Sequence, residues 1–474
     1  MRNMTLSNIS KACNGILYTA GNTGEKEVEG AVLDSRLIRK DYLFIASRGE
    51  RVDGHDYIET AIRQGAMAVV CEKAPADPSI PYILVKDSLL ALKDIATWYR
   101  MQLDIPVVGI TGSVGKTSTK EFVSSVLSQK YSILKTEGNY NNEIGLPLTI
   151  LQIRDDHEVA VLEMGISDFG EMHRLSSIAK PDYCLLTNIG QCHLENLGSR
   201  QGILKAKSEI FDFMSEDGSV ILNGDDDMLS TINNVKGKTP VRYGFGIDND
   251  VYADNIISNG LMGSTCNIHI GDEVLFVNIP MPGRHMILNA LAAALTGTVL
   301  GLTGDDIIQG IGQIQPVNGR NHIIHHEKWT VIDDCYNANP VSMRAAIDLL
   351  AMADTRKIAI LGDMGELGPE ENNLHEEVGT YAASKNIDII LCVGKLAAHI
   401  YNGAKNAFIH SNDAQYAKED ITKQPSEKLF FFETQDGLFK TLPMILEKGD
   451  TILVKASHFM GFDKVVSFVV SETA

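Results

Sequence analysis

The sequence predicts an α/β protein of three domains, and three observations lead to that fold class. The chain has 474 residues, which at roughly 100–200 residues per domain suggests about three domains. Short apolar runs rich in β-branched residues alternate with stretches of helical spacing along most of the chain. Residues 107–119 follow the order strand, glycine turn, helix, which is typical of a mononucleotide-binding fold.

Residues 1–86 predict a small N-terminal α/β domain, because short apolar runs alternate there with turns. We expect strands at 42–46, 68–71 and 82–85, and a helix at 57–64. A turn formed by Asp53 and Gly54 comes before that helix.

Residues 87–318 predict a central domain built on a parallel sheet, because its apolar runs are uninterrupted, as in strands buried on both faces. The expected elements are a helix over 87–101, a strand from Pro106, a helix over 117–129, strands over 159–163 and 183–187, an antiparallel extension over 241–279, and a buried helix over 286–300.

Residues 319–474 predict a C-terminal, Rossmann-like domain in which strands and helices alternate again. The expected strands are 329–332, 357–361, 387–392, 428–432 and 451–454. The first helix between them begins with Pro340, since proline is favoured at an early helical position.

Composition excludes several classes of protein. The chain carries 42 basic and 61 acidic residues, a net charge of −19. We therefore expect no nucleic-acid partner and no binding to anionic membranes, because both need basic patches. No run of about 18 apolar residues is present and the first residues lack an apolar signal core, so membrane insertion is not expected.

Cysteine usage indicates a reducing compartment. Seven cysteines are scattered along the chain with no CxxC pair, as expected for reduced thiols in a cytoplasmic protein. We expect the chain to be a monomer.

The clearest functional motif is the glycine-rich segment that follows the strand from Pro106. A strict GxxxxGK[ST] pattern would need glycine where this chain has Ile110. Gly112 and Gly115 still let the backbone wrap a phosphate with its N–H groups, at the positive end of a helix. The motif predicts an ATP site formed by Gly112, Ser113, Val114, Gly115, Lys116, Thr117 and Ser118. Lys116 would reach the β- and γ-phosphates, and Thr117 would hold Mg²⁺.

A carboxylate lies where a second metal ligand is expected. Glu163 ends one of the core strands, and ligands bind at the carboxyl edge of such sheets. Mg²⁺ prefers oxygen ligands of this kind. We expect Thr117 and Glu163 to share one Mg²⁺.

Several further segments together resemble the Mur ligase family of peptidoglycan synthesis, over nearly the whole chain. The segments are DSR at 34–36, DGHDYIETA at 53–61, GNYNNEIGLPLTIL at 138–151, EMGISDFGEM at 163–172, HLENLGS at 193–199, KAKSEIF at 205–211, DDCYNANP at 333–340 and GDMGELG at 362–368. The family's loop, GxTGxxGKTxT, accounts for Ile110. The chain departs from the family at Ala456, where a glycine is usual, and at Gln191 and Cys192.

The resemblance implies an N-terminal UDP-sugar domain, a central ATPase domain and a C-terminal Rossmann-like domain. It also implies a reaction: ATP phosphorylates the terminal carboxylate of UDP-MurNAc-tripeptide, and the amine of D-Ala-D-Ala displaces phosphate. Lys116, Lys207 and His193 would be catalytic, with His193 at a second Mg²⁺ and Lys207 carrying a CO₂-derived carbamate that supplies metal ligands. Read alone, His193 fits an ordinary loop histidine and Lys207 a solvated helix lysine.

The resemblance also assigns binding residues. Asn289, Arg320 and Asp334 would contact ATP. The substrate-binding residues would be Ser35 and Arg36 on the UDP side, Asn141 and Asn142 at the sugar-peptide, and Tyr336, Asn337 and Asn339 at the ribose or the dipeptide. The asparagines could instead be turn or helix-cap residues, and Arg320 a surface ion pair. The stretch 317–320 would be the hinge between the last two domains.

Two other functions stay open at this point. A folylpolyglutamate synthase would use the same ATP and carbamate chemistry, but it lacks the UDP-binding domain that carries the DSR and DGHDY segments. A non-catalytic nucleotide switch would release phosphate without consuming D-Ala-D-Ala. The sequence leaves open whether the third residue of the tripeptide is meso-diaminopimelate or lysine.

Overall fold

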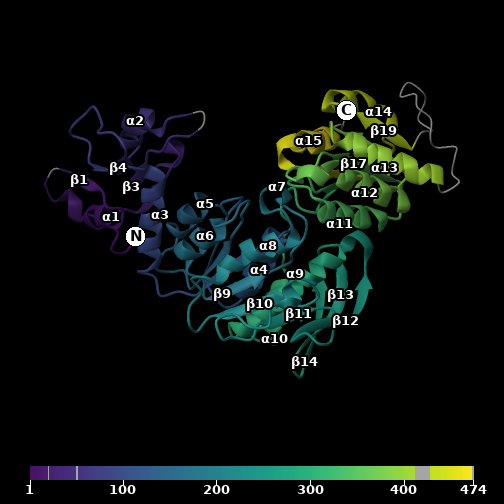
Figure 1. Ribbon diagram of the computed structural model, residues 1–474, viewed down its shortest axis with the longest axis horizontal. Helices are drawn as coiled ribbons and strands as arrows, with labels where there is room; N and C mark the ends of the chain where they lie inside the picture. The colour runs from purple at the N-terminus through teal and green to yellow at the C-terminus, as the bar shows by residue number, and fades with distance from the viewer. Residues whose placement is uncertain (20, 50–51, 411–427, 472–474) are drawn as a thin grey trace.

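The computed structural model describes residues 1–19, 21–49, 52–410 and 428–471. It has three lobes, each built on its own sheet, and the two outer lobes stand on either side of the central one (Figure 1). The three sheets fall within the three segments predicted as domains. Across the described residues, no helix is both long enough and apolar enough to cross a membrane.

The N-terminal lobe holds a five-stranded sheet. Its spatial order is β1 (Ile16–Tyr18), β5 (Tyr82–Leu84), β4 (Ala66–Cys71), β3 (Tyr42–Ile45) and β2 (Gly30–Val32). Only the β1–β5 pair is antiparallel. The helices are α1 (Leu6–Ala12) and α2 (Ile58–Arg63). The three predicted strands and the helix of this lobe are confirmed to within two residues.

The central lobe holds a nine-stranded sheet. Its order is β14 (Glu273–Ile279), β13 (Ser264–Ile270), β12 (Val251–Ser258), β11 (Val241–Gly244), β10 (Ser219–Asn223), β9 (Tyr183–Leu186), β6 (Val107–Thr111), β8 (Val159–Glu163) and β7 (Ile133–Lys135). Its helices are α3 (Ser88–Arg100), α4 (Lys116–Leu127), α5 (Gly145–Ile150), α6 (Glu171–Ala179), α7 (Leu194–Leu197), α8 (Arg200–Ser208), α9 (Arg284–Val299) and α10 (Gly304–Gly312).

The prediction of an antiparallel extension over 241–279 is wrong for its first part. Strands β10, β11 and β12 pair in parallel, and only β12, β13 and β14 pair antiparallel. The sequence shows strand residues but not the direction of pairing, which depends on how the short 245–250 connection crosses. The predicted strand from Pro106 begins at Val107, since proline has no N–H for the sheet.

The C-terminal lobe holds a six-stranded sheet. Its order is β15 (His322–His325), β16 (Thr330–Asp333), β20 (Thr451–Lys455), β17 (Lys357–Gly362), β18 (Ile389–Val393) and β19 (Leu429–Phe432). All pairs except β15–β16 are parallel. Its helices are α11 (Pro340–Ala351), α12 (Glu371–Ser384), α13 (Ala397–His410), α14 (Gln435–Ile445) and α15 (Asp463–Ser471). All five predicted strands are confirmed, with ends shifted by up to two residues.

The N-terminal and central lobes share a hydrophobic core, whereas the C-terminal lobe has cores of its own. One continuous core runs from the N-terminal lobe through α3, with Leu92, Ile95 and Tyr99, into the central lobe. The Tyr99 hydroxyl also donates to the carbonyl of Ile153, 2.7 Å away. The two main cores of the C-terminal lobe are built from its own buried residues. The first two lobes are therefore packed as one body, whereas the third is more independent.

Candidate functional site

A cavity of about 840 Å³ lies at the carboxyl ends of the central strands, between the central and C-terminal lobes. Most residues predicted for the site line it. From the central lobe these are Ser113, Val114, Gly115, Lys116, Thr117, Ser118, Asn141, Asn142, Glu163, His193 and Asn289. From the C-terminal lobe they are Arg320, Asp334, Tyr336, Asn337 and Asn339. The sheet edge thus collects residues that are far apart in sequence.

The glycine-rich loop between β6 and α4 is held in place by Thr187 and Asn188. A Cβ on Gly112 would lie 2.0 Å from Thr187 Oγ1, so only glycine fits at this position. The Thr187 hydroxyl donates to the carbonyl of Val114 at 2.7 Å, and Asn188 Oδ1 accepts from the Val114 amide at 2.9 Å. Gly112 shapes this loop although it is not on the cavity wall. The loop is therefore preorganised before any phosphate arrives.

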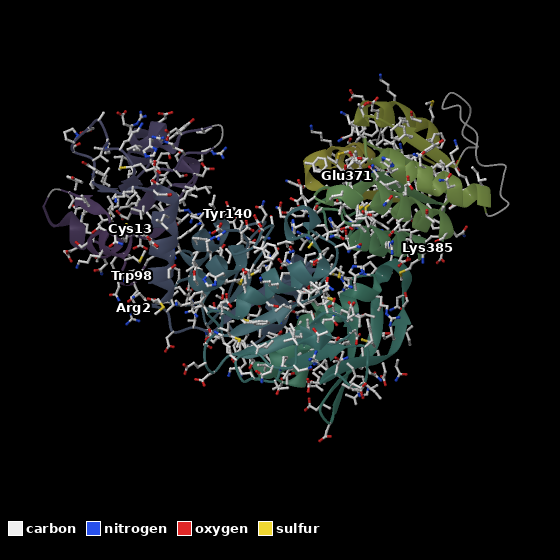
Figure 2. All side chains as sticks on the ribbon, viewed as in Figure 1. Arg2, Cys13, Trp98, Tyr140, Glu371 and Lys385 are labelled. Carbon is white, nitrogen blue, oxygen red and sulfur yellow. The ribbon has the colours of Figure 1, made fainter. Side chains whose placement is uncertain are left out.

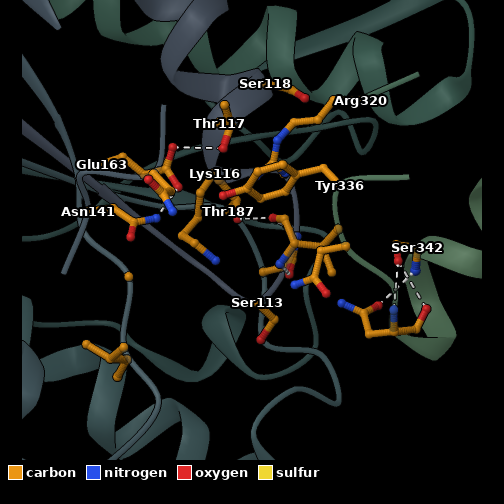
Figure 3. Close-up of a pocket in the computed structure, with 18 of the residues that line it drawn as sticks. Ser113, Lys116, Thr117, Ser118, Asn141, Glu163, Thr187, Arg320, Tyr336 and Ser342 are labelled. Carbon is orange, nitrogen blue, oxygen red and sulfur yellow. Dashed lines mark hydrogen bonds between the residues drawn. The ribbon is translucent and has the colours of Figure 1, made fainter. Parts of the chain in front are cut away.

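Lys116 and Thr117 begin α4 and point toward the cavity. Lys116 Nζ donates to the carbonyl of Gly112 at 2.9 Å. Figure 3 shows Lys116 between Glu163 and Asn141 on one side and Tyr336 on the other. A cation here faces the space that the loop leaves for phosphate groups.

Glu163 stands at the end of β8 with both carboxylate oxygens engaged (Figure 3). Thr117 Oγ1 donates to Oε2 at 2.8 Å, and Asn141 Nδ2 donates to Oε1 at 2.7 Å. The side chain is 1% exposed. A buried carboxylate beside a hydroxyl offers the hard oxygen ligands that Mg²⁺ prefers. In the described parts of the chain, no group of three or more His, Cys, Asp and Glu side chains could hold a metal ion, so phosphate oxygens and water would complete the shell.

Lys207, on α8, is fully buried rather than solvated. Its Nζ has no hydrogen-bond partner among the described residues. Burial, with a smaller contribution from the nearby charge of Lys116, lowers the Lys207 pKa from 10.5 to about 8. With this pKa, about a tenth of the molecules carry the amine uncharged at pH 7, far more than for an exposed lysine, and only the uncharged amine can add to CO₂. The site fits a carbamate, although Lys207 is not among the residues on the cavity wall.

His193 caps the start of α7 with a left-handed backbone, φ +50°. Its Nδ1 lies 2.6 Å from Glu366 Oε2 of the C-terminal lobe. The contact with His193 holds the pKa of Glu366 below its usual range. The two atoms lie within hydrogen-bonding distance, although their present angle does not form a hydrogen bond.

Arg320 and Tyr336 form one stacked pair, with the guanidinium carbon 4.2 Å from the ring centroid. On the central wall, Asn289 Oδ1 accepts from Thr119 Oγ1 at 3.0 Å. Asn289 therefore adjoins the helix that follows the loop. The stacked pair presents a flat cation to the cavity, which suits phosphate.

Three of the predicted binding residues also have structural partners. Asp334 Oδ2 accepts from the buried Lys455 Nζ at 2.5 Å. Asn339 caps α11, with its side chain accepting from the Ser342 amide at 2.9 Å. Asn142 Oδ1 accepts from the Gly145 amide at 2.9 Å, at the start of α5. Contact of these three side chains with substrate stays a prediction.

Ser35 and Arg36 lie apart from the cavity, in a short 3₁₀ turn of the N-terminal lobe. The Arg36 side chain is 86% exposed and pairs with Asp34, 2.6 Å away. Figure 2 places Tyr140 on the face of the central lobe between the two outer lobes. A ligand that touched both Arg36 and the cavity would have to cross this face.

The lining residues that were not predicted from the sequence include Asn188, His285, Asn321 and Lys455. His285 Nε2 accepts from Asn321 Nδ2 at 2.9 Å, across the two lobes, and burial lowers the pKa of His285. The signal for Asn188 was present in the sequence, because it directly follows the strand-end residue Thr187. Lys455 ends β20, and a charge at a strand end carries the same kind of signal.

Models of one protein family match successive parts of the chain, and relatives match nearly all of it. Family models match for the Mur ligase family catalytic domain at residues 27–98, the Mur ligase middle domain at 110–297, and the Mur ligase glutamate ligase domain at 319–458. A UDP-N-acetylmuramoyl-tripeptide–D-alanyl-D-alanine ligase of Bacillus subtilis is 36% identical over 468 residues, covering 98% of this chain and 97% of that protein.

Two solved structures are similar over nearly the same extent. A crystal structure of MurF from Acinetobacter baumannii has a TM-score of 0.87 and 30% identity, covering 99% of both chains. MurF ligase from Thermotoga maritima, in complex with ADP, has a TM-score of 0.79 and 29% identity, covering 94% of this chain and 97% of that one.

Proposed function

The chain belongs to the Mur ligase family, and on that basis we propose that it is the ATP-dependent ligase that joins D-alanyl-D-alanine to UDP-MurNAc-tripeptide. The observation that carries the proposal is the full-length match to relatives of that name, 36% identical over 98% of this chain. The product is the UDP-MurNAc-pentapeptide precursor of peptidoglycan.

ATP binds at the glycine-rich loop, with its phosphates along the amides of residues 112–118. Lys116 neutralises charge on the β- and γ-phosphates as the transferred group passes to the acceptor. Arg320, stacked on Tyr336, approaches from the C-terminal lobe, and Asn289 lies on the adenine side. The closeness of these groups around one cavity supports the assignment.

Thr117 and Glu163 would hold one Mg²⁺, and His193 with a Lys207 carbamate would hold a second. Bound there, Mg²⁺ would offset the negative charge that gathers between the γ-phosphate and the acceptor carboxylate. Glu163 is kept in place by Thr117 and Asn141. The unpartnered Nζ of Lys207 supports the carbamate, because no hydrogen bond occupies that nitrogen, and addition of CO₂ with loss of a proton would replace a buried cation by an anionic group with two oxygens for a metal.

The reaction proceeds in two steps, phosphoryl transfer and then acyl transfer. An oxygen of the tripeptide's terminal carboxylate attacks the γ-phosphorus, and ADP leaves. The amine of D-Ala-D-Ala then attacks the acyl carbon, loses a proton, and expels phosphate. The cavity walls from two lobes shield the acyl phosphate from water, which would otherwise hydrolyse it.

The remaining parts of the proposal concern partners and location. UDP binds near Ser35 and Arg36 of the N-terminal lobe, and the dipeptide binds near Tyr336, Asn337 and Asn339. The protein acts in the cytoplasm as a monomer. The seven buried free thiols support a reducing compartment.

A product assay tests the function directly. Purified protein is given ATP, Mg²⁺ and UDP-MurNAc-tripeptide, with and without D-Ala-D-Ala, and ADP and the new peptide are measured. We expect sustained ADP release with both substrates and a product heavier by one dipeptide less water. A nucleotide switch would release phosphate and leave the dipeptide unchanged, and an untouched tripeptide would show the proposal to be wrong.

A further inference from the structure

The segment GDMGELG at 362–368 matches the family but has no role in the reaction as described so far. It forms the loop between β17 and the 3₁₀ turn at Gly368–Glu370, in the C-terminal lobe. The loop reaches across to the central lobe, where Glu366 Oε2 lies 2.6 Å from His193 Nδ1. This contact joins a cavity-lining imidazole to the lobe that lies opposite.

The loop that carries Glu366 is firmly anchored to its own lobe. The amide of Met364 donates to His375 Nε2 at 2.9 Å, and the amide of Gly365 donates to Ser457 Oγ at 2.9 Å. Asp363 Oδ1 accepts from the amide of Ala397 at 2.7 Å. Glu366 is thus the exposed tip of a rigid loop, and its position follows the position of the whole lobe.

The backbones on both sides of the contact are unusual. His193 has φ +50° and Glu366 has φ +61°, in the left-handed region that side chains seldom adopt. Close by, a Cβ on Gly368 (φ +64°) would lie 3.3 Å from the Cα of Glu195, so glycine allows the two segments to approach. Two strained residues facing each other indicate that the pairing itself is maintained.

A carboxylate beside Nδ1 can fix which nitrogen of the His193 ring carries the hydrogen. When Nδ1 donates its hydrogen to a carboxylate, the other ring nitrogen, Nε2, keeps its lone pair and a fixed direction. Metal-binding histidines are commonly oriented in this way, and loss of the carboxylate weakens metal affinity or activity by roughly 10–100-fold.

We propose that Glu366 is a positioning residue for the reaction: it accepts the Nδ1 hydrogen of His193, fixes the ring so that Nε2 can bind Mg²⁺, and does so only when the C-terminal lobe is docked. The metal-binding part rests on the proposed function. The pairing of the two side chains does not.

Three variants separate this role from a general effect of charge. Glu366→Ala removes the acceptor, whereas Glu366→Gln keeps a carbonyl oxygen that accepts the same hydrogen. Glu370→Ala removes a nearby carboxylate of the same loop region, whose partner is Asn373 at 3.0 Å. Reaction rate is measured against Mg²⁺ concentration at saturating ATP, tripeptide and dipeptide.

We expect Glu366→Ala to raise the half-saturating Mg²⁺ concentration by roughly 10-fold or more. Glu366→Gln should give a smaller rise, and Glu370→Ala should stay within about twofold, as expected for a surface charge outside the contact. An unchanged Mg²⁺ dependence in Glu366→Ala would overturn the metal-positioning role. If Glu366→Ala melts early, the same comparison is made with Glu366→Gln.

A second measurement needs neither metal nor activity. The ring ¹⁵N resonances of His193 are recorded in metal-free protein, with and without UDP-MurNAc-tripeptide and D-Ala-D-Ala to favour the docked lobe, and are identified by their loss in His193→Asn. The wild type and Glu370→Ala should show the Nδ1–H form, and Glu366→Ala should show a mixture shifted toward Nε2–H. The same Nδ1–H form in Glu366→Ala would overturn the pairing. An inactive wild type with the expected spectra would contradict the proposed function and leave the pairing supported.

Discussion

At the scale of single residues, Lys207 offers the sharpest test of the chemistry. Lys207→Ala removes the amine that would carry the carbamate, so we expect ligase activity to fall by roughly 10²–10³-fold, as when other charge-stabilising groups are lost. Added short carboxylates should restore part of it by occupying the vacated space. Lys205→Ala, on the exposed face of the same helix, is the matched control. Equal activity of both variants would exclude the carbamate.

Lys455 is predicted to matter for stability. Its Nζ is buried against Asp334 at 2.5 Å. Lys455→Met would leave that carboxylate buried and unpaired, so the free energy of unfolding should fall by about 3 kcal/mol. Urea unfolding measures the change, and Lys464→Met on the exposed surface serves as control. A decrease of less than about 1 kcal/mol in the free energy of unfolding would mean that water replaces the lysine as the partner of Asp334.

Site residues could be predicted from the sequence where a local motif marks their position. Lys116, Thr117 and Glu163 were placed correctly beside one another, because a loop motif and a strand end fix their positions. The His193–Glu366 contact could not be predicted, since it joins segments about 170 residues apart across two lobes. The full burial of Lys207 could not be predicted either, because the same helix carries the exposed Lys205 two residues earlier.

At the scale of an element, α12 carries a buried histidine that should make the C-terminal lobe sensitive to acid. His375 accepts from the amide of Met364 and contacts the carbonyl of Glu371 at 2.6 Å. Burial lowers its pKa, and the backbone of Glu371 and the charges of Asp363 and Glu371 only partly oppose this. Below about pH 6.5, the usual pKa of histidine, His375 therefore binds a proton in the unfolded chain but stays neutral in the folded lobe.

The consequence is a fall in the free energy of unfolding as pH drops from about 6.5 toward the lowered pKa of the folded state. In His375→Gln this part of the pH dependence should disappear, although the variant loses some stability at neutral pH. Melting temperatures between pH 7 and pH 5 measure it, with the exposed His325→Gln as control. Parallel profiles for His375→Gln and the wild type would refute the assignment.

Elements were predictable where their burial pattern was strong. The buried strand 159–163 was placed with correct ends, because all five of its residues are buried. Strands β1, β2, β7, β10 and β15 were not predicted. In β1, β2 and β7, three residues are too few to show a period. The parallel pairing of β11 and β12 was missed because direction depends on the crossing of a loop, which periodicity does not report.

At the scale of the whole molecule, the distribution of cores predicts which lobe moves. The C-terminal lobe has its own cores and joins the central lobe through the tight turn 317–320, closed by a 3.1 Å bond from the Arg320 amide to the Val317 carbonyl. Small-angle scattering should show a smaller radius of gyration when an ATP analogue and both substrates are added. Unchanged dimensions would argue against a hinge at this turn.

The burial of all seven cysteines has a practical consequence for following that motion. Because native thiols are shielded, a maleimide dye should react first with cysteines introduced on the surface. One such cysteine on α6 and one on α12 would then form a donor–acceptor pair on the wild-type background. The spacing of the two lobes could be recorded molecule by molecule during turnover, without first removing a single native sulfur.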